Sequence, residues 1–317
     1  MSAEKNSVAL SNFFTSFFHN IPRLLLTNLL FALPFAVFFG IFYLIQAYLL
    51  KSIFVLFLTV IPLFPFYAGV TQATAHMARG EEEVDVIHNY IAGIKENYLR
   101  FLFHGLVLFG AIVFSYFSIS LYISLASSVS GFFYVLLVIS IIIAIIFLFA
   151  FYYLPSMTVT FDLSMKYIYK NSMLMTFGEL KHNLIATFGL FILALFCATA
   201  IFCCDDGIAL IIVTAILALF IVPSIMSYII NCAVYPNMYS MITNGKKKTK
   251  EIDRKLENRR NGQLFDDEPE KPFVPDDFND LEIDSTKDGD EYIFYNGKMV
   301  KRSVLIKQMQ QSKEDKQ

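Results

Sequence analysis

Residues 101–161 read FLFHGLVLFGAIVFSYFSISLYISLASSVSGFFYVLLVISIIIAIIFLFAFYYLPSMTVTF and contain no charged side chain. A helix that crosses the ~30 Å hydrocarbon core of a bilayer needs about 20 residues, because each residue adds about 1.5 Å of length. These 61 residues are therefore too many for one crossing and enough for two. The cluster of small and polar residues from Ser124 to Gly131 predicts a turn between the two membrane-spanning helices.

The same reasoning extends outward along the chain in both directions. Uncharged stretches of 27 residues lie on either side of Lys51 and predict two further spans joined by a turn at Lys51. Residues 183–204 predict a fifth span of 22 residues. Residues 207–245 are slightly too short for two helices plus a turn, so they predict one helix, roughly Ile208–Ile230, and a looser stretch around Pro236. The expected fold class is an all-α integral membrane protein with six transmembrane helices, amphipathic cytoplasmic helices and a mostly disordered C-terminal tail.

Charge divides the chain of 317 residues into two regions. Residues 1–245 carry 19 charged side chains, whereas the 72 residues from 246 to 317 carry 33. A soluble globular domain has about 25% charged residues, so neither region resembles one. We therefore expect a membrane domain over 1–245 and a charged cytoplasmic tail over 246–317. This division excludes a soluble enzyme and a secreted disulfide scaffold.

Positive charge in the short connections predicts the orientation of the spans. With six spans, one face collects 16 Lys and Arg residues, including eight between Lys246 and Arg260, and the other face has Lys51 alone. We therefore expect a multi-pass protein of the cell (plasma) membrane with both termini in the cytoplasm. Residues 1–22 lack the basic region and cleavage site of a secretory signal, so the first span is expected to be an uncleaved anchor.

Three segments that precede the odd-numbered spans have an amphipathic pattern. Between Arg79 and Arg100, apolar residues recur at steps of three and four, which is typical of one stripe of a helix: Val84, Ile87, Ile91, Ile94 and Tyr98. Similar faces precede the first and fifth spans: Phe13, Phe14, Phe17, Phe18 and Ile21, and more weakly Tyr167, Leu174 and Phe177. We expect these helices to lie along the membrane surface or against the bundle.

These segments also suggest an internal repeat of three hairpins. Each ends at an asparagine, Asn20, Asn97 or Asn183, and each even-numbered span carries proline. Internal repeats are common in membrane transporters. The alternative interpretation is that asparagine at a membrane entry point is an ordinary helix cap, and the sequence leaves both open.

The spans offer few polar candidates for a site. None contains a charged residue, which disfavours ion-coupled transport through a buried carboxylate. The strongest substrate-path candidates are Gln72 and His76 near the end of the second span, and His104 at the start of the third. They could line a cavity on the cytoplasmic side. The favoured alternative is that they lie at headgroup depth and contact water or lipid.

Other clusters predict neither catalysis nor a bound cofactor. Residues 79–83, Arg-Gly-Glu-Glu-Glu, are interpreted as a turn and an acidic helix start, in which the carboxylates complement the helix dipole. Cys203-Cys204-Asp205-Asp206 lacks the spacing of a zinc site, and we expect the four cysteines to be membrane-buried thiols. No nucleotide-binding or hydrolase motif is present. We expect no enzyme activity, no cofactor and no metal.

The tail begins with a basic cluster and ends with a hairpin signal. Its first lysines are expected to contact anionic lipid: Lys246, Lys247, Lys248 and Lys250. Acidic residues dominate from Asp266 onward, which argues against nucleic acid, and 266–290 is predicted to be disordered. Residues 291–302 carry Asn296-Gly297, which predicts a two-residue hairpin that pairs Phe294 with Met299 and Glu291 with Arg302. This hairpin is interpreted as a short partner-binding element on a tether.

Five short segments together resemble a known family: NLLFALP (28–34), PFYAGVTQA (65–73), RGEE (79–82), GIKENY (93–98) and YLP (153–155). Over residues 20–200 the chain is similar to the YesL-like family of bacterial integral membrane proteins. It departs from that family at 64–69, where FPFYAG replaces the usual Thr-x-Gly-Pro-Ala, and in its long tail. The resemblance implies a plasma-membrane protein of Gram-positive-type bacteria, often associated with carbohydrate uptake and degradation, and it implies no catalytic residues.

These observations lead to two hypotheses of function. The first is an accessory or regulatory component of a carbohydrate-uptake system, whose partners would be the lipid bilayer, membrane transporter subunits and other copies of the chain. The alternative is a small-solute transporter in its own right, built around Gln72, His76 and His104. The uncharged interior of the spans favours the first.

Overall fold

A computed structural model describes the backbone of residues 2–81, 84–260, 292–295 and 298–302. Side chains are described for residues 13–81, 84–242 and 301–302. The protein is a polytopic α-helical membrane protein, and the six predicted spans are confirmed: Phe13–Leu50, Phe54–Ala78, Val86–Ser128, Phe133–Thr160, Leu180–Phe202 and Gly207–Ile242. The chain forms two compact units, Met1–Pro236 and Asn237–Gln317.

The first two spans are joined at Lys51, as the sequence predicts. Helix α1 (Ser2–Ile45) continues into a π-helical turn, η1 (Gln46–Leu50). Lys51 then adopts a left-handed conformation with φ of 46°, which turns the chain back into the short helix α2 (Phe54–Phe57) and helix α3 (Val60–Ala78). Together α2 and α3 make the second span.

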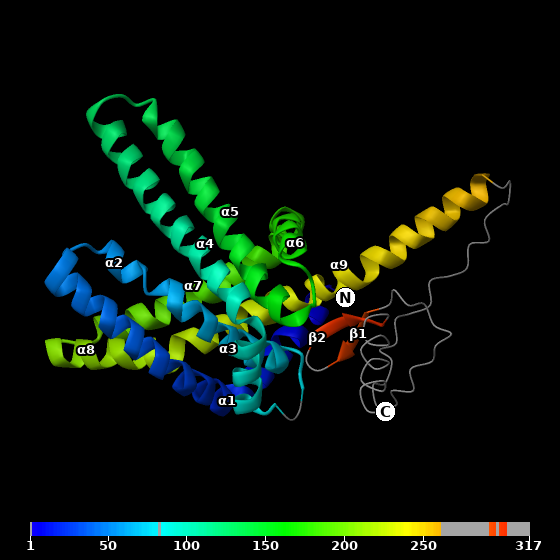
Figure 1. Cartoon of the computed structure of the whole chain (residues 1–317), viewed down its shortest axis with the longest axis horizontal. Helices are drawn as coiled ribbons and strands as arrows, with labels where there is room; N and C mark the ends of the chain where they lie inside the picture. The colour runs from blue at the N-terminus through cyan, green and yellow to red at the C-terminus, as the bar shows by residue number, and fades with distance from the viewer. Residues whose placement is uncertain (1, 82–83, 261–291, 296–297, 303–317) are drawn as a thin grey trace, which may run out of the picture. The chain divides into compact units, whose positions relative to one another are not determined.

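The uncharged stretch 101–161 also divides where its small and polar residues predict. Helix α4 (Val86–Ser128) and helix α5 (Phe133–Thr160) form an antiparallel hairpin (Figure 1). A separate helix, α6 (Met165–Gly178), follows and leads through Glu179 into α7 (Leu180–Phe202), the fifth span. The amphipathic segments of α1 and α4 therefore continue directly into their spans, whereas α6 is a helix of its own.

The sixth span is interrupted at a place that the sequence analysis did not predict. It consists of α8 (Gly207–Ile216), a π-helical turn η2 (Leu217–Ile221) and the first part of α9 (Val222–Arg260). The expected loosening at Pro236 is wrong, because α9 continues through this residue. The irregularity lies instead directly before Pro223, which has no backbone N–H to continue the helical hydrogen bonds.

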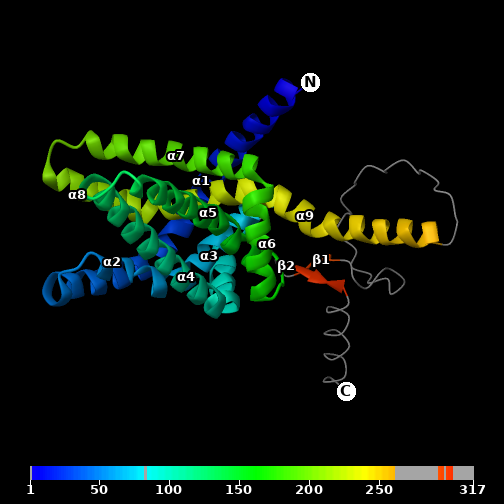
Figure 2. The same cartoon turned by 90° about the horizontal axis from the view of Figure 1, so that it is seen from above.

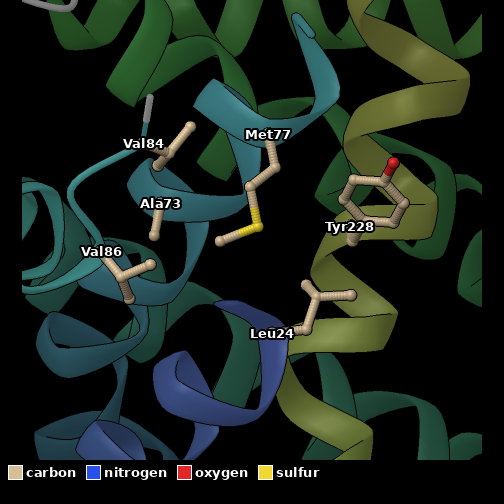
Figure 3. Close-up of a cluster of buried hydrophobic side chains, with 6 residues drawn as sticks. All are labelled: Leu24, Ala73, Met77, Val84, Val86 and Tyr228. Carbon is tan, nitrogen blue, oxygen red and sulfur yellow. The ribbon is translucent and has the colours of Figure 1, made fainter. Parts of the chain in front are cut away.

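The packed core lies where the even-numbered spans end, a region that we call the basic face because it carries Arg23, Arg79, Arg100, Lys166 and Lys181. One buried cluster there joins α1, α3, the start of α4 and α9: Leu24, Ala73, Met77, Val84, Val86 and Tyr228. Their side chains point toward one another around Met77 (Figure 3). Toward the opposite face the spans expose many large apolar side chains, such as Tyr43, Leu49, Phe117 and Leu121. This pattern is expected where lipid replaces water as the solvent.

Glycines hold α3 and α4 in close contact. A Cβ atom added at Gly69 would lie 2.6 Å from the Tyr90 ring, and one at Gly93 would lie 2.7 Å from Gln72 Cβ. A Cβ atom at Gly105 would lie 2.8 Å from Phe64 Cβ. Small residues of this kind let membrane helices approach closely enough for their backbones to touch.

This glycine contact determines which side of α4 is buried. The buried positions are Val86, Tyr90, Gly93, Asn97 and Phe101. The predicted stripe is instead largely exposed, at 50% for Ile87, 44% for Ile91 and 44% for Tyr98. The stripe is expected to lie along the membrane surface or against the bundle, and of its members Val84 is buried in the bundle whereas Ile87, Ile91 and Tyr98 are not. The small residue at position 93, rather than the apolar periodicity, selects the packed face.

The second unit contains a short hairpin. Strand β1 (Tyr292–Tyr295) pairs with β2 (Lys298–Lys301) in antiparallel register, with Phe294 opposite Met299. This is the register that the Asn-Gly signal predicts. The turn residues 296–297, Glu291 and the acidic segment 266–290 lie outside the described residues.

Replacing Gly93 by alanine should destabilise the membrane domain. The added methyl group must displace Gln72 or the Ala68 carbonyl, and overpacking of this kind costs about 1–3 kcal/mol. The matched control is Gly110→Ala on the same helix, where no atom lies within 4 Å and alanine should gain up to about 1 kcal/mol of helix propensity. Thermal unfolding in detergent measures both variants. Equal stability of the two variants would contradict the close α3–α4 contact.

Candidate functional site: an arginine cluster shared by three spans

Arg79 ends the second span and reaches the other two even-numbered spans. Its side chain is 6% exposed. The guanidinium donates from NH2 to Thr160 Oγ1 at 3.3 Å, and Thr160 is the last residue of α5. The same guanidinium lies over the Tyr235 ring of α9, 5.4 Å from its centroid, and its NH1 lies 3.6 Å from Glu81 Oε1. One buried cation thus contacts groups from all three even-numbered spans or the residues that follow them.

A tight turn brings Glu81 back toward the end of α3. Gly80 has φ of +78°, a left-handed conformation that glycine adopts without the strain a side chain would cause. Glu81 then faces His76 and Arg79, and α4 begins later, with Asp85 as its N-cap accepting a hydrogen bond from the His88 N–H. The interpretation of Glu81 as part of an acidic helix start is therefore wrong. Glu82 and Glu83 lie outside the described residues.

Two of the predicted site residues, Gln72 and His76, belong to this cluster. His76 Nδ1 lies 2.6 Å from Glu81 Oε2, and His76 Nε2 lies 3.3 Å from Gln72 Nε2. Because an ionised carboxylate can only accept, His76 Nδ1 carries the proton, and a neutral ring then accepts from Gln72 at Nε2. A doubly protonated ring would need Gln72 Oε1 instead, and this buried oxygen has no hydrogen-bond partner among the described residues.

Burial and charge act in opposite directions on the cluster. Burial lowers the pKa of Arg79, while Tyr235 and the Glu81 carboxylate oppose that effect. Burial alone would raise the pKa of Glu81, but the hydrogen bond from His76 and the positive charge of Arg79 outweigh it and lower this pKa below its ordinary value. Glu81 is therefore ionised at neutral pH and compensates the buried charge of Arg79.

His104, the third candidate, lies in a different contact. Its Nδ1 is 2.9 Å from the Tyr169 hydroxyl of α6, and its Nε2 is 2.9 Å from Thr158 Oγ1 of α5. Burial raises the pKa of Tyr169 to about 12, so this hydroxyl stays neutral. His104 is fully buried, and Gln72 and His76 are 2% and 6% exposed, so the expectation that the three contact water or lipid is wrong. Three helices, α4, α5 and α6, meet at His104.

A second polar contact, which the sequence did not predict, provides hydrogen bonds to backbone groups at the interruption of the sixth span. Asn28 of α1 donates from Nδ2 to the carbonyls of Phe220 and Ile221, at 2.8 and 3.1 Å, and accepts at Oδ1 from the Ser224 N–H at 2.8 Å. These backbone groups lie beside Pro223, where a regular helix is impossible. The available signals were an asparagine inside one apolar span and a proline inside another.

Helix α9 also makes contacts with α3 through buried hydroxyl and amide groups. Thr74 Oγ1 lies 2.7 Å from Ser227 Oγ, and Asn231 Nδ2 donates to Thr74 Oγ1 at 3.0 Å. The three asparagines of the suggested repeat are buried too, and Asn183 Oδ1 accepts from the Tyr153 hydroxyl at 2.7 Å. Their burial fits the repeat hypothesis. The third hairpin differs from the first two, however, because the segment before its first span forms a separate helix, α6.

The remaining candidate groups form no metal or redox site in the described part of the chain. No three His, Cys, Asp or Glu residues within it lie close enough to hold a metal ion. The four cysteines are free thiols. The lysines expected to contact anionic lipid, Lys246, Lys247, Lys248 and Lys250, lie in α9, and their side chains are outside the described residues.

Comparisons with protein-family models, with curated proteins and with solved structures found no match for this chain.

Replacing Arg79 by alanine should destabilise the membrane domain strongly. The change removes the hydrogen bond to Thr160, the contact with the Tyr235 ring and the ion pair with Glu81, whose side chain is 35% exposed, so we expect a loss of about 2–3 kcal/mol. The control is Arg100→Ala, whose ion pair with Asp162 is 30% and 50% exposed and should contribute less than about 1 kcal/mol. Unfolding in mixed detergent micelles measures both. A loss at Arg79 no greater than that at Arg100 would show that the cluster does not hold the spans together.

Glu81 should also make stability depend on acid pH. Its folded pKa is lowered, so its contribution is complete above the unfolded value of about 4.3 and is lost as pH falls through the folded pKa. The Glu81→Gln variant should therefore lose less stability than the unmodified protein between pH 6 and pH 3. Thermal unfolding midpoints across this range measure the difference, with Asp205→Asn at an exposed position as the control. Parallel curves for Glu81→Gln and the unmodified protein would contradict this assignment.

Proposed function

We propose that the protein is an accessory or regulatory component of a membrane system for carbohydrate uptake, with the basic face in the cytoplasm. Its spans would pack against subunits of a transporter. The carbohydrate part of this proposal rests on the resemblance of residues 20–200 to the YesL-like family. The orientation rests on the distribution of Lys and Arg between the two faces.

The observation that carries the accessory role is the apolar surface of the third and fifth spans. In the most apolar 18-residue stretch of each, 6% of the residues are buried within the chain. On α7 the exposed side chains are large, with Phe188, Phe191 and Phe196 each more than half exposed. Such faces pack equally well against lipid or against the helices of a membrane partner.

The polar groups support the same role in a different way. Arg79, Glu81 and His76 contact one another, and His104 contacts Tyr169 and Thr158. These contacts bind helices together at the basic face. A substrate path would instead need such groups to face a water-filled cavity.

A transporter in its own right is the second candidate, and the interrupted sixth span is the observation that favours it. Broken membrane helices often form the substrate and ion sites of secondary transporters, because their free carbonyl groups can bind cations. Here Asn28 occupies the carbonyls of Phe220 and Ile221. Transport would therefore require a substrate to displace or join this amide.

Purification from native membranes tests the two proposals together. The protein is extracted in a mild detergent with an affinity tag, and the proteins that co-purify in stoichiometric amounts are identified. We expect subunits of a carbohydrate transporter, and we expect their yield to fall when Phe188, Phe191 and Phe196 are changed together to alanine. Failure to recover any membrane partner, combined with solute uptake by liposomes that contain this chain alone, would overturn the accessory role. Uptake that is lost in Asn28→Leu would assign transport to the interrupted span.

A further inference from the structure

Helix α6 runs crosswise to the membrane-spanning helices. It is seen end-on in Figure 1 and lengthwise in Figure 2, where its direction is crosswise to that of α7 and α8. The helix lies between the end of the fourth span at Thr160 and the start of the fifth at Leu180. A helix that runs crosswise to the fifth and sixth spans and joins two spans at one face is placed to lie along that membrane surface.

One side of α6 is fixed to the bundle. Ile168, Ser172, Met175 and Thr176 are buried, and the helix packs against α5 and α7. The Tyr169 hydroxyl, 2.9 Å from His104 Nδ1, ties it to α4 as well. The helix is therefore held in position with one face inward, and the direction of its outer face is determined.

The outer face combines apolar and basic side chains. Its exposed members are Lys166, Tyr167, Lys170, Met173, Leu174 and Phe177. Tyr167 and Phe177 are 56% and 60% exposed, values that are high for aromatic side chains in water. The sequence of α6 contains no acidic residue. A surface of this composition complements a bilayer interface with anionic headgroups, where aromatic rings lie at headgroup depth and lysines extend toward the phosphates.

We propose that α6 is an interfacial anchor that inserts Leu174 and Phe177 into the leaflet at the basic face and binds anionic lipid headgroups through Lys166 and Lys170. This inference does not depend on the proposed function, since it concerns only the lipid around the protein. The anchor lies on the side of α6 opposite to the buried residues Ile168, Ser172 and Met175. Anionic lipid bound there would hold the helix that joins the fourth and fifth spans.

The chain contains no tryptophan, so one introduced tryptophan reports its own surroundings without background. We place it at Leu174 or at Phe177 in the full chain, reconstituted into phosphatidylcholine vesicles with a minority of phosphatidylglycerol. The expected result is blue-shifted emission that is quenched by lipids with brominated acyl chains and little quenched by aqueous iodide. Phe188→Trp, on the exposed side of the fifth span, is the matched control for lipid contact and for correct folding.

A separate experiment tests whether α6 binds anionic lipid headgroups. Bromine is placed on the phosphatidylglycerol alone or on the phosphatidylcholine alone, and the two quenching curves are compared for Leu174→Trp. The preference for phosphatidylglycerol should fall about fivefold for each lysine removed in Lys166→Gln and Lys170→Gln at low salt. It should also fall as salt is added, because exposed charges are screened.

Three outcomes would overturn the anchor. Emission typical of water, with strong iodide quenching at both positions while Phe188→Trp behaves as a lipid-exposed site, would place the face in solvent. A blue shift that grows with the protein-to-lipid ratio would assign the face to contact between copies of the chain. Quenching that is equal for the two lipids and unchanged by the lysine variants would exclude the binding of anionic headgroups.

Discussion

The burial of one guanidinium group constrains the arrangement of the whole membrane domain. A charge removed from water is costly unless it is paired and hydrogen-bonded, and Arg79 is 6% exposed. Its partners are supplied from separate places: Glu81 by the turn after α3, Thr160 by the end of α5, and the ring of Tyr235 by α9. No single hairpin provides all of them. Glu81 is local to Arg79, but the contacts with Thr160 and Tyr235 form only when the ends of the three even-numbered spans converge, so this one group favours the assembled bundle over its separate hairpins.

The glycines of α3 and α4 and the Asn28 side chain make this convergence possible at particular places. The glycines at positions 69 and 93 let α4 approach α3 closely, which places the start of α4 beside the end of α3. Asn28 satisfies the backbone of the sixth span where Pro223 interrupts it, which a bilayer core without water could not do. Short side chains carry out both tasks, because they bring backbones together without adding bulk. The parts of the spans toward the opposite face need neither glycine contacts nor side-chain hydrogen bonds, since lipid can solvate their apolar side chains.

This difference explains how far the sequence could be interpreted. The number of spans, the turn at Lys51 and the division of 101–161 follow from the length of uncharged chain that a bilayer requires, and the structure agrees with each. The buried faces could not be predicted in the same way. In water an apolar stripe indicates the core, but beside lipid Ile87 and Ile91 are stable when exposed, and the packed face of α4 carries Gly93 and Asn97 instead. Asn28 and Arg79 depend on partners more than 80 residues away in the sequence, which no local pattern reveals.

The location of the packed core also bears on the choice between the two proposed functions. A transporter that opens toward the basic face would have to separate Arg79 from Thr160 and from the Tyr235 ring, at a cost of about 2–3 kcal/mol for the hydrogen bond and the cation–π contact together. Without a ligand that offsets this cost, the open state would hold about 3% of the molecules or less, and a substrate would need that much preference for the open form. An accessory protein meets no such requirement, because its apolar faces toward the opposite side can adjust to a partner while the Arg79 cluster stays intact.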